Sequence, residues 1–213
     1  MKISKQAVYG ILTAISLFTL TGCSHSQNPE VANELHFSLE GISDVTIAYD
    51  EEQITFFEAE EDELVVKEYM TQNKDSYYAN VKQNGSSIHV SEGGKPLFKG
   101  NFNRRIEVFL PVSYDETLTV TTTDGTIDLS NVQLQLSELC IGSTDGEVDI
   151  DSVTADSIQI DTTSGIVTCN ELVGDVEYTS TSGSAKIKSA VGSGSYKANN
   201  SGRLEVDYAE VTG

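Results

Sequence analysis

The sequence predicts an all-β fold, a β-solenoid of short strands with turns of about 19 residues, preceded by a strand-rich N-terminal part. Two observations predict it. Apolar and polar residues alternate in short runs along most of the chain, which is the period of β-strands. From Leu118 onward, one pattern of small polar residues, a glycine and alternating apolar residues recurs. A β-sandwich or a meander of ordinary hairpins is the alternative.

Residues 1–22 have the pattern of an export signal. Lys2 and Lys5 supply positive charge, and the uncharged run AVYGILTAISLFTL follows over residues 7–20. This run is short for a membrane span and typical of a secretory signal. It closes in Leu20-Thr21-Gly22-Cys23, which resembles the lipobox of bacterial lipoproteins. The resemblance implies a diacylglyceryl group on Cys23 and cleavage just before it. An ordinary signal peptide with a chance cysteine, or an uncleaved membrane span, is the alternative.

Residues 23–35 are expected to form the lipidated Cys23 and a flexible tether, because the stretch after the cysteine is polar and aperiodic. Removal of residues 1–22 leaves 191 residues (213 − 22) with a formal charge of −22 (11 − 33), since two lysines leave with the signal. Such acidity argues against a nucleic-acid partner and against close contact of the body with an anionic lipid surface. It permits cationic partners and divalent metals.

The strand-rich N-terminal part covers residues 36–111. Asn84-Gly85 stands between two alternating runs, which predicts a β-hairpin. Residues 63–70 could be helical by composition, but neighbouring strands favour a strand there. Residues 106–110 alternate, and Pro111 ends that strand.

The repeats predict the solenoid over residues 112–213. Each glycine follows small polar residues, and apolar residues stand two and four positions after it and seven and five before it. Equivalent turns that stack on one another would bury these apolar faces in a continuous core. The fifth repeat departs, because its apolar pair, Tyr196 and Ala198, is one residue out of register, which predicts a bulge or a frayed end. The glycines are Gly125, Gly146, Gly165, Gly183 and Gly202, with spacings of 21, 19, 18 and 19 residues.

The strand Ile106-Glu107-Val108-Phe109-Leu110-Pro111, followed by repeats of small-polar, Gly, x, apolar, x, apolar, resembles the bacterial "putative adhesin" family, a domain of unknown function with β-strand repeats. The resemblance covers about residues 36–213. It implies a β-solenoid on the cell surface or in envelope-stress systems. It supplies no catalytic residues to carry over.

The chain shows no enzyme motif. It lacks a glycine-rich phosphate loop, an HExxH helix and a CxxC pair, so neither a cofactor nor a metal centre is predicted. Cys169 falls on an inward repeat position and Cys140 on an outward one. Their opposite faces argue against a disulfide, and a structural role is expected for each.

Acidic residues dominate one long segment. Residues 106–185 contain fifteen Asp and Glu and no Lys or Arg. Stacking should place Asp124 beside Asp145 and Asp128 beside Asp149, and these four residues are the candidates for binding a cation or a cationic peptide. Like charges about 5 Å apart are unfavourable unless they are solvated, protonated or bridged by a cation such as calcium. A solvated acidic face without a ligand is the simpler interpretation.

Three functions are compatible with these features. The first is a non-catalytic, lipid-anchored binding or scaffold module on the extracytoplasmic face of the cell membrane, with a cell-wall polymer, a cationic peptide or a neighbouring membrane protein as partner. The second is an accessory or regulatory protein of an envelope-stress or transport system. The third is an envelope glycan enzyme, which would need a cleft with paired carboxylates in unequal environments.

Overall fold

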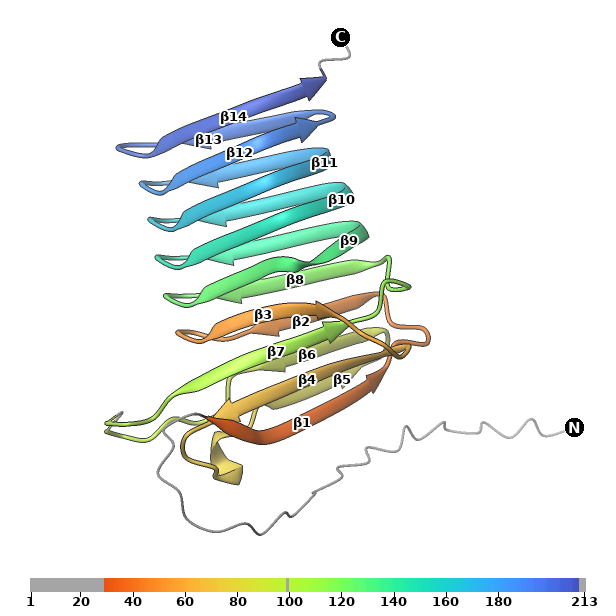
Figure 1. The fold of residues 1–213 in the computed structure, drawn as a ribbon, viewed down its shortest axis with the longest axis vertical. Helices are drawn as coiled ribbons and strands as arrows, with labels where there is room; N and C mark the ends of the chain where they lie inside the picture. Colours follow the sequence, from red (N-terminus) through yellow and green to blue (C-terminus); the bar gives the residue numbers. More distant parts are fainter. Residues whose placement is uncertain (1–28, 99, 211–213) are drawn as a thin grey trace, which may run out of the picture.

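The computed structural model describes residues 29–98 and 100–210, so the predicted export signal and Cys23 lie outside the described residues. The strands join in one coiled sheet (Figure 1). Within the described ranges, no helix has the length and apolar character needed to cross a membrane. The elements are β1 (Glu30–Ser38), β2 (Asp44–Ala48), β3 (Gln53–Glu58), β4 (Glu63–Met70), the 3-10 turn η1 (Asp75–Tyr77), β5 (Asn80–Asn84), β6 (Ser87–Ser91), β7 (Arg104–Leu110), β8 (Thr117–Thr122), β9 (Thr126–Ser143), β10 (Glu147–Thr162), β11 (Ile166–Ser180), β12 (Ser184–Val191), β13 (Gly194–Ala198) and β14 (Arg203–Glu210).

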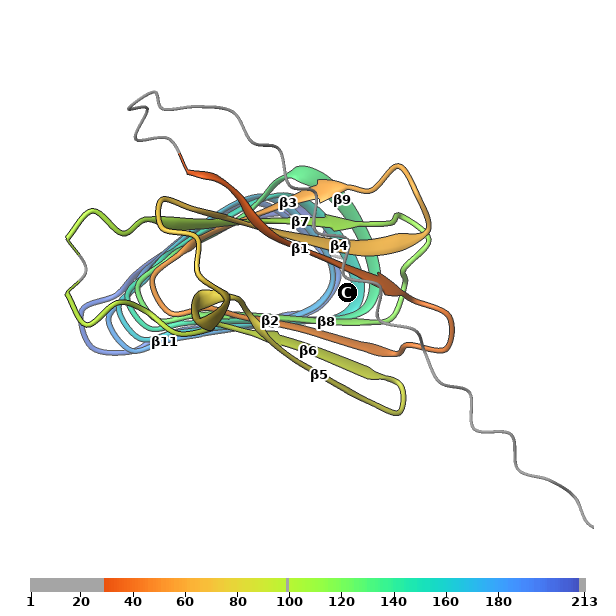
Figure 2. The ribbon, with the colours of Figure 1, turned by 90° about the horizontal axis from the view of Figure 1, so that it is seen from below.

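The predicted β-solenoid is confirmed. The long strands β9, β10 and β11 each pass from one broad face of the coil to the other, and each pairs in parallel with the next turn. Val148 pairs with Ile127 on one side and with Val167 on the other, which is the repeat register that the glycine spacing predicts. Seen along its axis, the stack is a flattened tube with stacked corners (Figure 2).

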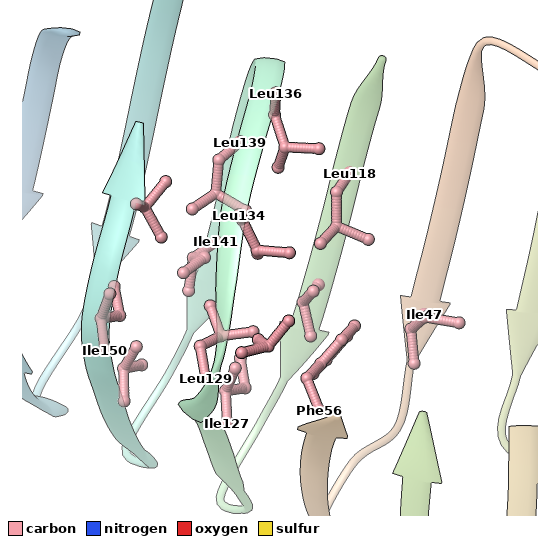
Figure 3. Close-up of a cluster of buried hydrophobic side chains, with 14 of the residues drawn as sticks. Ile47, Phe56, Leu118, Ile127, Leu129, Leu134, Leu136, Leu139, Ile141 and Ile150 are labelled. Carbon is pink, nitrogen blue, oxygen red and sulfur yellow. The ribbon is translucent and has the colours of Figure 1, made fainter. Parts of the chain in front are cut away.

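The core lies inside this tube and is built from alternate residues. Leu118, Leu139 and Ile158 are fully buried in successive turns, and they pair in register. Figure 3 shows this stacking for Leu118, Leu139 and their neighbours. Ile160 is fully buried, whereas the adjacent Gln159 is exposed. The alternation therefore has the inward and outward faces that the sequence predicts.

The repeated glycines form one corner of the coil, where successive turns approach closely. A Cβ atom on Gly146 would lie 2.1 Å from the carbonyl oxygen of Gly125, so no larger residue fits without a shift of the backbone. These glycines do not have positive φ values, so crowding explains them. The hydroxyl of Ser143 accepts a hydrogen bond from the Gly146 N–H at 3.0 Å, and Thr122 and Ser180 repeat this contact.

The N-terminal part supplies a further turn of the same stack. β2 lies between β6 and β8, and β3 lies between β7 and β9, all in parallel. Residues 44–58 thus pair with a turn that begins about 70 residues later in the sequence. Chain order and spatial order differ here.

Antiparallel strands extend this end of the stack. β4 pairs with β7 and β1 with β4 on one face, and β5 pairs with β6 on the other. The strand predicted over residues 63–70 and the hairpin at Asn84-Gly85 are confirmed, and Gly85 has φ 62°. The flexible tether predicted up to residue 35 is wrong from Glu30 onward, because β1 begins there and pairs with β4 through Ser38.

The last turn absorbs its register shift at the corner. Tyr196 pairs with Tyr178 and Ala198 with Ser180, so β13 itself is in register. One additional residue lies in the corner that follows, where Asn200 adopts φ 56°. Asparagine tolerates this left-handed conformation better than most residues, so the irregularity is in the corner and not in the strand.

Candidate functional site

One predicted acidic pair lies on a broad face of the coil. Asp128 and Asp149 are directly paired in register between β9 and β10. Partial burial raises the pKa of the Asp149 carboxyl, and the neighbouring Asp128 and Glu147 charges raise it further. Asp128 is held by Ser130, whose N–H donates at 2.9 Å. The predicted stacking of this pair is therefore present, and it has an electrostatic cost.

The other predicted pair lies at the glycine corner. Asp124 and Asp145 are both exposed, and their turns stack because the Asp145 N–H donates to the Thr123 carbonyl at 2.8 Å. The two acidic pairs thus occupy different parts of the coil. Residues 29–98 and 100–210 contain no group of three or more His, Cys, Asp or Glu that could hold a metal ion. Each pair by itself offers two carboxylates in adjacent turns, and such charges attract positive groups by diffuse electrostatics.

Basic residues reach the acidic face from the next turns. The Asn170 amide donates to Asp151 at 2.6 Å and accepts from Lys188 at 2.6 Å, so a lysine contacts the acidic segment through one asparagine. Lys186 lies 2.9 Å from Glu205, which lowers the pKa of that carboxyl. The acidic surface therefore ends at a partly neutralised strip along β12 and β14.

A buried ion-pair cluster, which sequence reasoning missed, lies at the same corner in the first turns. By register, Glu52 stands below Gly125 and Arg104 below Glu52. Arg104 Nη2 and Nε donate to Glu52 Oε1 at 2.9 Å and 3.1 Å, and Nη2 also contacts Glu92. Lys95 Nζ lies 2.5 Å from Glu92 and 3.4 Å from Glu52. In the first turns, charged side chains thus occupy the corner at which, in later turns, the glycine backbones pack directly against one another.

A signal for this cluster was present in the sequence. Glu52 is followed by Ile54 and Phe56 at the spacing that follows each glycine, and it is preceded by Val45 and Ile47 at the spacing that precedes it. Substituting a charged residue for the glycine hid the repeat. The register of β2 and β3 with β8 and β9 confirms that the segment from Val45 to Phe56 is a repeat.

Beside the cluster lies an open groove of about 500 Å³. Lys95 and Glu92 pair with each other in it, and Glu92 Oε2 also accepts a hydrogen bond from the Asp50 backbone N–H at 3.0 Å. The exposed Asp50 carboxylate accepts from the Thr123 hydroxyl at 3.5 Å. The Thr122 hydroxyl donates to the Asp50 carbonyl at 2.9 Å. The groove therefore presents neutral polar groups, the Lys95–Glu92 pair and the exposed Asp50 carboxylate. Its lining residues are Ala48, Tyr49, Asp50, Ser91, Glu92, Gly93, Lys95, Thr121, Thr122 and Thr123.

A second buried acid lies next to the cluster. The Glu68 side chain is buried, and its carboxylate accepts hydrogen bonds from the Asn33 amide at 2.8 Å, the Ala79 N–H at 2.8 Å and the Tyr49 hydroxyl at 3.2 Å. Burial raises the pKa of Glu68, and these hydrogen bonds oppose the rise. Arg104 also lowers it through its charge. The contacts tie β1 and β4 to Tyr49, directly after β2, and to Ala79, directly before β5.

The cysteines lack the environment of a nucleophile. Cys169 is buried on an inward position, and burial raises the pKa of its thiol to about 12. Burial also raises the pKa of Cys140, and the neighbouring Glu138 charge raises it further. Both thiols are unpaired, as their opposite faces predicted. A reactive thiolate needs the opposite shift.

Comparison with known proteins places the fold. A crystal structure from Clostridium sporogenes ATCC 15579, described as a "putative cell adhesion protein", aligns with a TM-score of 0.53 at 13% identity, over 83% of this chain and 99% of that one. A "putative adhesin" from Parabacteroides distasonis ATCC 8503 aligns with a TM-score of 0.41 at 10% identity, over 82% and 96%. No curated protein matches the chain. The family model Toastrack DUF4097 matches residues 42–213, and the chain therefore belongs to the Toastrack DUF4097 family.

Proposed function

We propose that this chain is a non-catalytic, adhesin-like binding or scaffold module, anchored by lipid on the outer face of a bacterial membrane. The observation that carries the proposal is the surface of the coil. Fifteen Asp and Glu and no Lys or Arg occur over residues 106–185, and the parallel turns stack two pairs of them, Asp124 with Asp145 and Asp128 with Asp149, as two short acidic rows. A rigid charged surface of this kind recognises a partner without a catalytic pocket.

The anchor is supported by the order of the N-terminal features. The positive start, the short apolar run and the lipobox end at Cys23, and β1 begins only seven residues later, at Glu30. A diacylglyceryl group supplies two acyl chains, which hold a protein on a membrane stably. The solenoid would then stand close to the membrane surface and present its rows to the outside.

A cationic peptide is the ligand class that the surface fits best. The paired Asp128 and Asp149 carry like charges in adjacent strands, and the Asp149 pKa is raised. A bound cation relieves this repulsion, so the rows should attract positive charge more strongly than scattered acids do. The raised pKa of the Cys169 thiol does not suit a nucleophile, and Lys95 and Glu92 in the groove pair with each other. Both observations support a binding role over a catalytic one.

Titration of a polycationic peptide into the mature domain tests the binding function. The test variant carries Asp124→Asn, Asp128→Asn, Asp145→Asn and Asp149→Asn. The control variant has the same change in net charge at four exposed acids outside residues 106–185, Glu58→Gln, Glu60→Gln, Glu61→Gln and Asp62→Asn.

We expect the test variant to bind more weakly than the control, and the affinity of the wild type to fall steeply as salt rises. Equal binding by all three proteins, or no binding in physiological salt, would show that the acidic rows serve only solubility.

A further inference from the structure

Two adjacent apolar side chains are exposed at the tip of the loop between β6 and β7. Leu97 is 98% exposed and Phe98 is 89% exposed. Single apolar residues on a surface are ordinary, but two neighbouring large ones with almost no contact to their own domain indicate a binding surface.

The base of this loop is held firmly, so the tip is presented outward. On one side, Lys95 lies 2.5 Å from Glu92 and 3.4 Å from the buried Glu52. On the other side, the Thr71 hydroxyl donates to the Asn101 carbonyl at 2.7 Å. The loop is therefore tied to the ion-pair cluster and to β4 while its apolar tip stays in solvent.

The tip lies at the edge of the sheet where the N-terminal segment enters. Glu30 pairs with Met70, and Met70 pairs with Arg104, the first residue of β7 after the loop. Two strand spacings separate Glu30 from Arg104, about 10 Å. Figures 1 and 2 both show the start of β1 and this loop on the same side of the molecule, at the same end of the stack.

The lipid on Cys23 would therefore lie near this tip. Six residues lie between Cys23 and Glu30, and the seven Cα–Cα steps span at most about 25 Å when fully extended. The adjoining η1 segment lies against the loop, because the Gly94 N–H donates to the Ser76 carbonyl at 3.0 Å, and its start carries the exposed Lys74 and Asp75. Lysine and apolar side chains together are typical of segments at the water–lipid boundary.

We infer that Leu97 and Phe98 insert into the lipid interface beside the acyl anchor and orient the solenoid on the membrane. The inference rests on the proposed lipid anchor. The acidic rows oppose an approach of the body to anionic lipid, so a membrane contact is favourable only where apolar groups replace acids. The tip lies at the N-terminal end of the stack, so β9 and β10, which carry Asp128 and Asp149, lie farther along the stack from it.

Tryptophan fluorescence tests the insertion, because the chain contains no tryptophan. The lipid-modified chain with Phe98→Trp is reconstituted into phosphatidylcholine vesicles, with and without brominated acyl chains. The control is Tyr208→Trp, an exposed aromatic in β14 at the other end of the stack. Vesicle flotation measures anchoring separately in every sample.

We expect Phe98→Trp to shift its emission to shorter wavelength on vesicles and to lose most of it with brominated lipid, and Tyr208→Trp to do neither. If both proteins float and neither is quenched, the insertion is wrong while the anchor stands. If neither floats, the anchor fails and the inference fails with it. A concentration-dependent blue shift without vesicles would assign the tip to a second copy of the chain and overturn the lipid contact.

Discussion

Arg104 and Glu52 form a buried ion pair at the corner position that glycine occupies in all later turns of the coil. Their side chains are 0% and 5% exposed, and Arg104 donates two hydrogen bonds to one Glu52 oxygen. Arg104 Nη1 also donates to the Tyr77 carbonyl at 2.9 Å. The corner is thus formed by closely packed glycine backbones in the later turns and by a buried ion pair at the N-terminal end of the stack.

Removal of the arginine should be costly because it leaves buried carboxylates without a partner. We expect Arg104→Met to lower the free energy of unfolding by about 3–5 kcal/mol. The neighbouring Arg105→Met is the matched control, because Arg105 is more than a third exposed and pairs with Glu107 at the surface, where the loss should be about 1 kcal/mol. Chemical denaturation of both variants measures the difference, and equal losses would contradict the buried pair.

Crowding at the glycine corner leads to a second comparison. Gly146→Ala would place a Cβ 2.1 Å from a backbone oxygen, whereas the Cβ of Gly142→Ala would meet only the Thr121 methyl at 3.3 Å. We expect a loss of about 1–3 kcal/mol for Gly146→Ala, and a much smaller one for Gly142→Ala. Thermal unfolding of the two variants is sufficient to test this, and a tolerated Gly146→Ala would show that the turns do not stack as closely as described.

The raised pKa of Glu68 predicts a pH dependence. Because its folded pKa lies above the ordinary 4.5, the group contributes most stability below that value and loses it as pH rises through the folded pKa. Glu68→Gln removes this titration but can keep the hydrogen bonds to Asn33 and Ala79. The unfolding free energy of the wild type, relative to Glu68→Gln, should fall as pH rises above about 4.5. A constant or rising difference between the two denaturation series would refute the raised pKa.

The inward and outward alternation is tested in β10. Ile160→Asp puts an unpaired charge into the core and should destabilise the fold by several kcal/mol, roughly 4 or more. Gln159→Asp changes an exposed side chain of the same strand and should cost within about 0.5 kcal/mol. Similar losses at the two positions would mean that the register is shifted by one residue, which exchanges the two faces.

Sequence reasoning succeeded where the signal was local. Alternating residues marked the strands, Asn84-Gly85 marked the hairpin, and the spacing of glycines from Gly125 onward predicted which residues stack. These features depend on neighbours within one turn of about 19 residues.

Long-range pairing was the part that local patterns could not supply. β2 pairs with β8, and β1 with β4, across long stretches of chain, and nothing within either segment specifies its partner. The pairing of Glu52 with Arg104 depends on this register, so the buried cluster could not be assembled from single segments. The acidic pairs were predicted because both partners lie in consecutive repeats, but the sequence did not show that the two pairs lie in different parts of the coil.

The location of the protein is the claim on which its proposed function depends most. Mass spectrometry of the chain purified from a bacterial membrane fraction tests it directly, by identifying the N-terminal peptide. We predict that the mature chain begins at Cys23 with a diacylglyceryl thioether, and that Cys23→Ala leaves an unprocessed precursor or releases the protein from the membrane. A mature chain that begins elsewhere without lipid, or a Cys23→Ala variant that is still processed and acylated, would contradict it.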